Sequence, residues 1–379
     1  MALTIDERDE LRVAARSLLA RESSPERVRA VVDTADGYDT GLWKQMVELG
    51  WTAIHVDEAL GGAGCTYADL SVVLHELGRA LTPSPFLASA VLASGALALS
   101  ENPAVREELL PQLASGDVLG TVAFANATGS YDSSQLTCAW TSSDGALTLT
   151  GHAGFVLDAD VAAVIVVAAA DSAGRPCAVA LDAAAPGIHI ERTPTVDATR
   201  RLFRVTFDGV VADETRMLTE PGVAAAALLD SVLARGVIAA SCDAVGAARL
   251  ALEEAAAYAS QRVQFGKPIG TFQAVKHHCA DMAIAVEASA AATRAAAEAL
   301  DGDRSAWASA AQTVASFVGP ACSEACALGL LVHGGIGFTW EQDSHMLLKR
   351  VKLDEVLFGT PRWHRRRLAD AVFPARLGR

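Results

Sequence analysis

One stretch of the chain constrains its fold more than any other. From about Val223 to Gln261 the sequence is rich in Ala and Leu and contains no proline. As a single helix this stretch would extend about 55 Å, given a rise of about 1.5 Å per residue. Two further long helices are predicted at about 271–300 and 303–329, with turn signals between them. Long helices joined by short turns indicate an antiparallel bundle over residues 216–379.

The sequence before this bundle divides into two zones. Residues 1–118 are predicted to be helical, and within 67–81 the apolar residues recur with the i, i+3, i+4, i+7 spacing of one helix face. Residues 119–215 instead contain short β-rich runs. The expected strands are Thr121–Phe124, Leu147–Thr150, Val161–Val167, Cys177–Leu181, Ile188–Arg192 and Leu202–Phe207. No helix separates them, which favours an antiparallel sheet or a small barrel over a βαβ fold.

Composition and charge argue against several classes of protein. The 379 residues include 31 Lys and Arg against 45 Asp and Glu, a net charge of −14. Nucleic acids and anionic membranes would repel such a chain. No apolar run approaches the roughly 20 residues that span a bilayer, and the acidic N-terminal segment is unlike a signal peptide. We therefore expect a cytoplasmic protein that binds no nucleic acid and does not span a membrane.

The cysteines point in the same direction. There are seven, an odd number, and they are scattered without any CxxC spacing. This pattern predicts reduced, mostly buried thiols rather than a disulfide framework or a zinc site. We expect no metal centre in this chain.

The most specific motif runs from Tyr258 to His277, where one long helix is expected to end and the next to begin. Arg262 at a helix end presents a guanidinium that suits a diphosphate. Gln273 would lie in the first turn of the next helix, where free backbone N–H groups also favour an anion. The motif alone is equally compatible with another interpretation, in which Arg262 only caps its helix and Phe265 and Phe272 are core residues.

A second motif reads HGGIGFTWEQD and runs from His333 to Asp343. Its closely spaced glycines would let a backbone approach a flat or charged ligand, although a tight turn between helices explains such a segment equally simply. Together, the two motifs resemble the acyl-CoA dehydrogenase family, in which RxxFGxxI…FQ and QxxGGxGF recur in this order. The chain is most similar to bacterial, actinobacterial-type members whose last motif reads HGGIGFTWE, and the resemblance covers essentially its whole length.

The resemblance implies an α+β fold that is mainly helical. It implies an N-terminal helical domain at 1–118, a middle antiparallel β-barrel at 119–215 and a C-terminal four-helix bundle at 216–379. It also implies FAD as the cofactor, bound between barrel and bundle at the interface of a dimer or tetramer. The implied reaction is α,β-dehydrogenation of an acyl thioester, either an acyl-CoA or an acyl-carrier-protein in a biosynthetic pathway. The hydride would pass to flavin N5, and the electrons would then pass to an electron-transfer flavoprotein.

The family's FAD contacts carry over onto named positions. Arg262 and Phe265 would contact the diphosphate and adenosine side, with Ile269 and Gln273 nearby. The adenosine end would be lined by Gly334 and Gly335 of the partner subunit, and Thr360 would also touch FAD. In the middle domain, Ser130 belongs to a degraded form of the segment that covers the flavin, and Phe155 could stack on the isoalloxazine. Leu331 replaces the usual Gln that opens the second motif, so one polar contact is lost.

The catalytic base is missing from both family positions. The reaction needs a desolvated carboxylate with a raised pKa within reach of Cα. Phe358 stands where most members have Glu, and Gly236 stands where a minority place it. Asp243 lies two helical turns after Gly236 in an apolar stretch, which makes it the candidate substitute. The alternative is that Asp243 pairs with an Arg such as Arg249, or faces solvent.

Three functions remain open on these grounds. The first is an oligomeric FAD-dependent acyl-thioester dehydrogenase with Asp243 as its base. The second is a subunit with little or no catalysis of its own in a heteromeric acyl-CoA dehydrogenase, of the kind that sterol side-chain oxidation uses. The third keeps the fold but performs flavin-dependent oxidation of nitrogen compounds.

Overall fold

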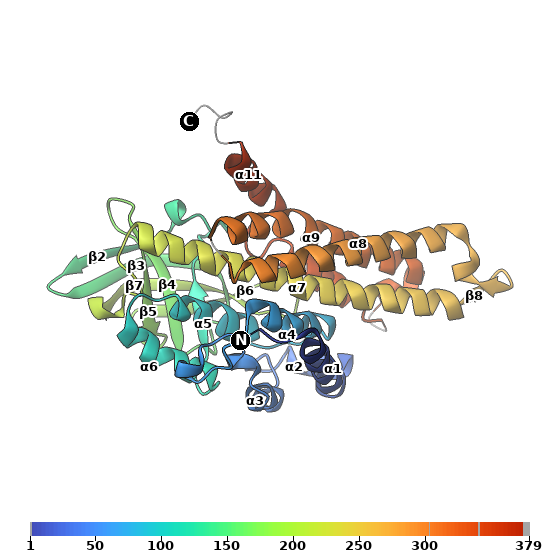
Figure 1. Cartoon of the computed structure of the whole chain (residues 1–379), viewed down its shortest axis with the longest axis horizontal. Coiled ribbons are helices and arrows are strands. Elements are labelled where there is room, and N and C mark those ends of the chain that lie inside the picture. Colours follow the sequence, from blue (N-terminus) through green and yellow to red (C-terminus); the bar gives the residue numbers. More distant parts are fainter. Residues whose placement is uncertain (1, 303, 340–341, 374–379) are drawn as a thin grey trace. The chain divides into compact units, whose positions relative to one another are not determined.

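The computed structural model describes the whole chain except residues 1, 303, 340–341 and 374–379. It forms two compact units that interleave along the sequence (Figure 1). The first consists chiefly of Val31–Thr66 and Pro83–Gly236, and the second of Leu3–Ala30, Tyr67–Thr82 and Val237–Arg379. The zone boundaries expected from the sequence, at 118 and 215, stay predictions.

Helices precede the sheet in the first unit. They are α3 (Thr40–Glu48), a π-helical turn at Leu87–Ala93, α5 (Ser94–Ala98) and α6 (Pro103–Ala114). The N-terminus of α3 is capped by Asp39, whose carboxylate accepts two backbone N–H groups. That of α6 is capped by Asn102, and a proline follows where no helical N–H is needed.

Seven strands then form one sheet in the order β1-β4-β2-β3-β7-β6, with β5 also paired to β4. They are β1 (Gly120–Ala123), β2 (Cys138–Ser143), β3 (Ala146–Leu157), β4 (Val164–Ala170), β5 (Pro176–Asp182), β6 (Ile188–Thr193) and β7 (Leu202–Asp213). Most pairs are antiparallel, as predicted, but β1 pairs with β4 in parallel, so the sheet is mixed. β2 also pairs with β4 in parallel, at Ala139 and Ala170.

The sheet buries an apolar core on one face. In β7, Phe203, Val205 and Phe207 are buried while Arg204 is exposed. This alternation is expected of a strand that has one face toward the core and the other toward solvent. Strand β2 was not predicted from the sequence, because only Cys138 and Trp140 of its six residues are buried and the others are small or polar.

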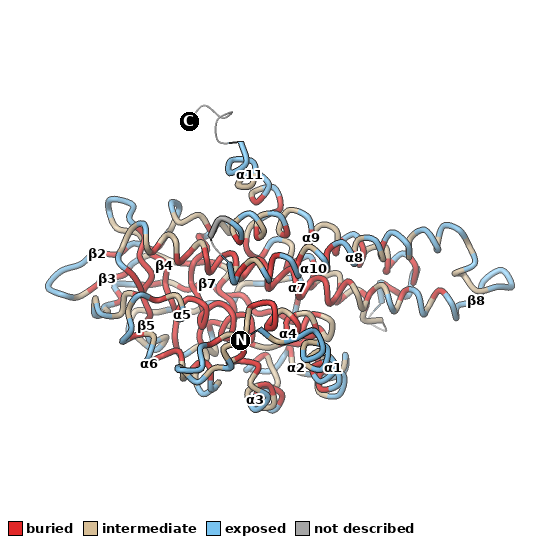
Figure 2. The backbone as a smooth tube through the Cα atoms, viewed as in Figure 1, coloured by how far each residue is buried: buried red, intermediate tan, exposed pale blue. Residues whose placement is uncertain are grey.

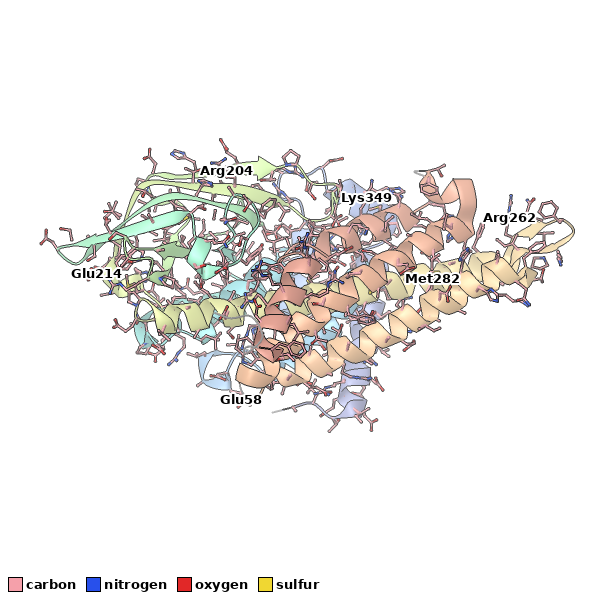
Figure 3. All side chains as sticks on the ribbon, turned by 90° about the horizontal axis from the view of Figure 1, so that it is seen from above. Glu58, Arg204, Glu214, Arg262, Met282 and Lys349 are labelled. Carbon is pink, nitrogen blue, oxygen red and sulfur yellow. The ribbon has the colours of Figure 1, made fainter. Side chains whose placement is uncertain are left out.

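The second unit is a helical bundle. It contains α1 (Ile5–Glu22), most of α2 (Pro25–Val31), α4 (Tyr67–Arg79), the C-terminal part of α7 (Val223–Gln261), α8 (Gln273–Ala299), α9 (Arg304–His333), α10 (Ser344–Asp354) and α11 (Pro361–Val372). Figures 1 and 3 show α8 and α9 side by side. The predicted helices at 67–81, 223–261, 271–300 and 303–329 are all present, and α9 continues through Pro320 to His333. Bundle and sheet together confirm the predicted α+β fold class.

Two helices, Val223–Gln261 and Ala306–Phe338, are long and apolar enough to cross a membrane by length and composition alone. In their most apolar windows, 67% and 50% of the residues are buried inside the protein. This is weak support for a membrane span, because the core helix of a soluble protein meets the same criteria.

A pair of glycines lets α4 and α7 approach closely. A Cβ atom added to Gly246 would lie 1.9 Å from the His75 carbonyl oxygen, and one added to Gly78 would lie 2.1 Å from the carbonyl oxygen of Asp243. Both contacts are with backbone, which cannot rotate away as a side chain does. The two helices therefore cross at a distance that only glycine permits at these positions.

We predict that Gly246→Ala lowers the free energy of unfolding by about 1–3 kcal/mol, because the helices must move apart. Denaturant unfolding of the purified chain measures this. Gly335→Ala is the matched control, since a Cβ atom there meets nothing within 4 Å. Equal stabilities of the two variants would contradict the close crossing.

Candidate functional site

The junction between α7 and α8 is a short hairpin at the centre of the most specific sequence motif. Its strands, β8 (Val263–Gln264) and β9 (Lys267–Pro268), pair antiparallel around Phe265 and Gly266. The φ angles of Phe265 and Gly266 are 53° and 77°, so both turn residues are left-handed, as in a type I′ turn. Glycine adopts this conformation freely, but for a phenylalanine it costs about 1–2 kcal/mol. Strain of this kind clusters at functional sites.

The residues of this hairpin are mostly exposed, as the colouring of the backbone shows (Figure 2). The ring of Phe265 is 90% exposed and meets Phe272 edge-on, with 6.0 Å between ring centroids. Arg262, labelled beside the hairpin in Figure 3, is exposed and makes no ion pair with any residue that the structure describes. The interpretation of Phe265 as a core residue is therefore wrong, and the Arg262 guanidinium is open to a ligand.

The other two predicted residues of this motif lie next to the hairpin. The Ile269 N–H donates to the Arg262 carbonyl at 2.8 Å, which fixes the spacing between the end of α7 and the turn that follows. Gln273 is the first residue of α8 and is exposed. The structure thus gathers Arg262, Phe265, Ile269 and Gln273 on one end of the bundle.

The glycine-rich motif continues α9 as a short 3-10 helix, Gly334–Phe338. A Cβ atom added to Gly334 or Gly335 would find nothing within 4 Å, so the backbone is open there. Leu331 and Phe338 beside it are 59% and 66% exposed. Trp340 and Glu341, which complete the motif, lie outside the described residues.

A stacked pair of rings brings the two motifs close together within one chain. Tyr258, one turn before Arg262, stacks on His333 with 4.7 Å between ring centroids. His333 is buried, and its Nδ1–H donates to the Gly329 carbonyl at 2.8 Å. The sequence analysis did not predict that Tyr258 contacts the second motif. Its position at the start of the first motif could have indicated this.

In the first unit, the two segments expected near the flavin also lie together. Gly129 is next to the ring of Phe155, and a Cβ atom on that glycine would lie 3.4 Å from Phe155 Cε2. Phe155 has a φ of 53° and stands at an irregularity in the pairing of β3 with β7. The Ser130 N–H donates to the Asn126 side-chain oxygen at 3.0 Å, which shapes the loop. The segment that contains Ser130 therefore lies beside Phe155, and the contact of either residue with a flavin stays a prediction.

The usual position of the catalytic glutamate holds a buried aromatic side chain. Phe358 is buried, and its carbonyl accepts a hydrogen bond from His364 Nε2 at 2.9 Å. Burial lowers the pKa of His364 to about 4, so the ring is neutral near neutral pH and holds the backbone without supplying a charge. Thr360 caps α11, with its hydroxyl accepting the Trp363 N–H at 3.3 Å.

The second family position is also without a carboxylate, since Gly236 is buried in α7. Asp243, the candidate substitute, is only 4% exposed, and its Oδ1 lies 3.0 Å from Nε of Arg350, which is 1% exposed. A buried guanidinium favours an ionised carboxylate, whereas the expected base has a raised pKa. Arg249, the partner considered from the sequence, pairs instead with Glu287 at 2.5 Å. The catalytic role of Asp243 stays a prediction, and Arg350 gives it a structural alternative.

These residues fit FAD on chemical grounds. Arg262 offers an unpaired guanidinium for a diphosphate, and Phe265 offers an exposed ring for a heteroaromatic group. The open backbone of Gly334 and Gly335 offers close approach. Within the described residues, no group of three His, Cys, Asp or Glu side chains is placed to hold a metal ion, and the cysteines are free thiols.

Family models decide the identification. One described as the acyl-CoA dehydrogenase C-terminal domain matches residues 227–373, and one described as the N-terminal domain of the same family matches residues 5–117. The chain belongs to the acyl-CoA dehydrogenase family. Membership confirms the predicted resemblance, and it confirms FAD as the cofactor of a flavoprotein oxidoreductase fold.

Similar proteins extend over nearly the whole chain. Acyl-CoA dehydrogenase IpdE2 of Mycobacterium tuberculosis is 34% identical over 372 residues, covering 97% of this chain and 98% of its own. A solved variant of the Tcur3481-Tcur3483 steroid ACAD is 30% identical, with a TM-score of 0.87 and coverage of 97% and 98%. The ChsE4-ChsE5 complex from Mycobacterium tuberculosis is 25% identical, with a TM-score of 0.88 and coverage of 98% of both chains.

We predict that Asp243→Asn lowers the free energy of unfolding by about 3–5 kcal/mol, because Arg350 is left buried without its carboxylate. Denaturant unfolding at neutral pH measures the loss. The double variant Asp243→Leu/Arg350→Met should recover most of it, since apolar side chains can replace a buried ion pair. Arg249→Gln, which breaks an exposed ion pair on the same helix, should cost at most about 1 kcal/mol. An Asp243→Asn protein as stable as the parent would rule out the structural role.

One buried acid on α7 has a strongly shifted pKa. Burial, with a smaller contribution from the Asp343 carboxylate, raises the pKa of Glu254 to about 7. Its Oε2 is buried and has no hydrogen-bond partner among the described residues. Because the folded state binds this proton more tightly than the unfolded state, the contribution of Glu254 to stability falls as pH rises from about 4.5 to about 7.

We predict that Glu254→Gln is more stable than the parent by about 1–2 kcal/mol at pH 8 and nearly equal to it at pH 4.5. Unfolding free energies measured across this range test the difference, in which the contributions of all other groups cancel. Glu253→Gln removes the neighbouring exposed carboxylate, which makes only a minor contribution to the raised pKa of Glu254, so its stability should follow the pH dependence of the parent much more closely. If the unfolding free energy of Glu254→Gln changed with pH in the same way as that of the parent, the raised pKa of Glu254 would be contradicted.

Proposed function

We propose that this chain is one subunit of a heteromeric acyl-CoA dehydrogenase that performs FAD-dependent α,β-dehydrogenation of an acyl thioester. One observation carries the proposal. Both family positions for the base lack a carboxylate, and one of them, Phe358, is filled by a buried ring held by His364. The base then comes from a related partner chain. When bound, FAD accepts the hydride that leaves Cβ.

The surface of the second unit supports assembly with another chain. Phe265, Leu331 and Phe338 are each more than half exposed, and they lie on the two motifs joined by the Tyr258–His333 stack. Large apolar side chains clustered in this way are typical of surfaces that a partner covers. We infer that this chain contributes Arg262 and its neighbours as anchors for the cofactor, while the partner contributes the missing groups.

Related proteins suggest the substrate class. The steroid ACAD at 30% identity and the ChsE4-ChsE5 complex are described as assemblies of two differently named chains. We propose a thioester of a steroid-derived or similar bulky acyl group as the substrate, with electrons passing to an electron-transfer flavoprotein in the cytoplasm. The acidic net charge of −14 disfavours an acidic carrier protein as the group that bears the acyl chain.

A second candidate function is a homomeric dehydrogenase in which Asp243 is the base. Its burial favours this role, since desolvation raises the pKa of a carboxylate, but the ion pair with Arg350 opposes it. The two candidates differ in what the chain does alone, so a single spectroscopic experiment separates them.

We predict that the purified chain alone is colourless, or yellow without bleaching when acyl-CoAs are added anaerobically. Co-expressed with a related chain that carries glutamate at the position of Phe358, it should co-purify as a yellow complex. Visible flavin absorbance of this complex should bleach with a matching thioester, because the complex then holds both base and cofactor.

The control is the same complex with that glutamate changed to glutamine, which should stay yellow and not bleach. Bleaching by the chain alone would contradict the heteromer, and its loss in Asp243→Asn with retained FAD would then favour the homomeric enzyme. Oxidation of a nitrogen compound that depends on oxygen or NADPH would favour N-oxidation instead.

A further inference from the structure

A cavity of about 430 Å³ lies among four helices of the second unit, away from both FAD-binding motifs in the sequence. Its walls come from α1, α4, α7 and α8. Five arginines and a single glutamate line it, an inversion of the chain's overall acidic character. The arginines are Arg8, Arg12, Arg16, Arg249 and Arg294.

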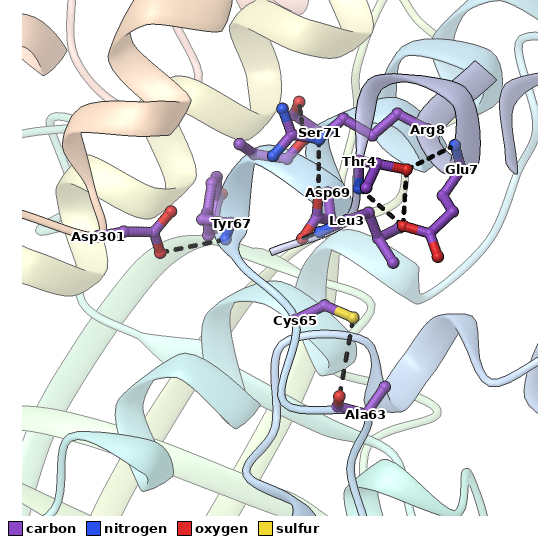
Figure 4. A network of polar contacts seen from close by, with 11 residues as sticks. Leu3, Thr4, Glu7, Arg8, Ala63, Cys65, Tyr67, Asp69, Ser71 and Asp301 are labelled. Atoms are coloured by element: carbon purple, nitrogen blue, oxygen red, sulfur yellow. Dashed lines mark hydrogen bonds and ion pairs between the residues drawn. The ribbon is translucent and has the colours of Figure 1, made fainter. Parts of the chain in front are cut away.

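Two of these arginines are held in place by buried carboxylates. Arg8 Nε donates to Asp69 at 2.6 Å, and Arg16 donates to both oxygens of Glu76 at 2.9 Å (Figure 4 shows the first pair). Asp69 and Glu76 are almost fully buried, while the two arginine side chains remain 23% and 45% exposed. Such pairs position a guanidinium before a ligand arrives, which reduces the entropy lost on binding.

The other three arginines of the cavity differ in whether a carboxylate already pairs with them. Arg12 pairs with Asp9 on the same helix, and Arg249 pairs with Glu287 at 2.5 Å. Arg294 makes no ion pair with any residue in the described part of the chain, although it lies near enough to Glu287 to lower the pKa of that carboxyl together with Arg249. Among the described residues, Arg294 is therefore the arginine at this cavity without an ion pair of its own.

A hydroxyl group also belongs to the lining of the cavity. Ser71 donates its hydroxyl hydrogen to the Ala68 carbonyl at 2.6 Å, so its oxygen can still accept a hydrogen bond but offers no second donor to an anion. Recognition of an anion at this cavity therefore falls to the guanidiniums.

We propose that this cavity binds a small polyanion that carries a diphosphate group. Several guanidiniums converging from separate helices suit two adjacent phosphates, since each phosphate accepts hydrogen bonds from more than one side. The volume suits a ligand between inorganic pyrophosphate and a nucleoside diphosphate in size. The site would act apart from Arg262, so the protein would hold two separate diphosphate groups when FAD is bound.

Isothermal titration of the FAD-loaded protein tests the proposal, and the assembled complex is used if the chain holds FAD only there. Inorganic pyrophosphate, ADP and orthophosphate are titrated in metal-free buffer of low salt. We expect saturable binding of pyrophosphate at one site per chain, weakened several-fold when salt screens the charges. Arg294→Gln should weaken it by about tenfold or more. Tighter binding of ADP would identify a nucleotide as the source, and exclusive binding of pyrophosphate would identify the inorganic ion.

Two control variants keep the proposal open to refutation. Arg27→Gln removes an exposed, paired arginine that does not line the cavity, and it should bind pyrophosphate as the parent does. Arg262→Gln should also retain this binding, even if FAD is lost. Three results would each overturn the site. The first is the absence of a saturable heat of binding, and the second is an affinity for orthophosphate equal to that for pyrophosphate. The third is a loss of pyrophosphate binding in Arg262→Gln but not in Arg294→Gln. None of these outcomes depends on dehydrogenase activity, so the heteromer proposal stands or falls separately.

Discussion

The helical unit depends on a buried ion pair between Asp243 and Arg350. The two side chains lie on α7 and α10, and Arg350 also donates to the Thr82 carbonyl beyond the end of α4 at 3.1 Å. One guanidinium thus connects three segments that are distant in the sequence. The glycine crossing of α4 and α7 supports the same arrangement, because Gly78 lies directly against the backbone of Asp243. A charge pair buried this deeply is costly to desolvate, so its geometry must be maintained by the packing around it.

This constraint bears on catalysis. The Asp243 carboxylate is held beside Arg350 by a contact of 3.0 Å, whereas a base for the α-proton must approach the substrate and carry a raised pKa. The second family position is an unsubstituted glycine, and the first is a phenylalanine whose backbone is fixed by a neutral histidine. Arg262, Phe265 and Gln273, which would anchor FAD, are nevertheless present and exposed. Retention of the cofactor motifs without the base is the combination expected of a subunit that shares its chemistry with a partner.

The sequence was informative where local rules dominate. The limits of α7 followed from an Ala- and Leu-rich run without proline, and the change from one long helix to the next was expected within the motif from Tyr258 to His277. Strand β2 could not be predicted, because its few buried residues are set by pairing with β3 rather than by its own composition. The partner of Asp243 was beyond sequence reasoning for a similar reason. Arg249 is closer along the chain, but the packing of α10 against α7 selects Arg350, more than a hundred residues away. The roles of the family residues came from resemblance, and the structure adds which of them are neighbours.

The exposed groups of the second unit share one explanation. Phe265 is held in a left-handed conformation that projects its ring into solvent, and Leu331 and Phe338 are apolar side chains on a neighbouring motif that also remain outside the core. A monomer gains nothing from a strained, exposed aromatic residue, since burial of that ring elsewhere would be worth about 1.5–3 kcal/mol. The strain and the exposure are tolerable only if another surface covers them. Under the proposed function, the absent base calls for a second chain for chemical reasons and this surface calls for one for physical reasons, so a single related partner would satisfy both.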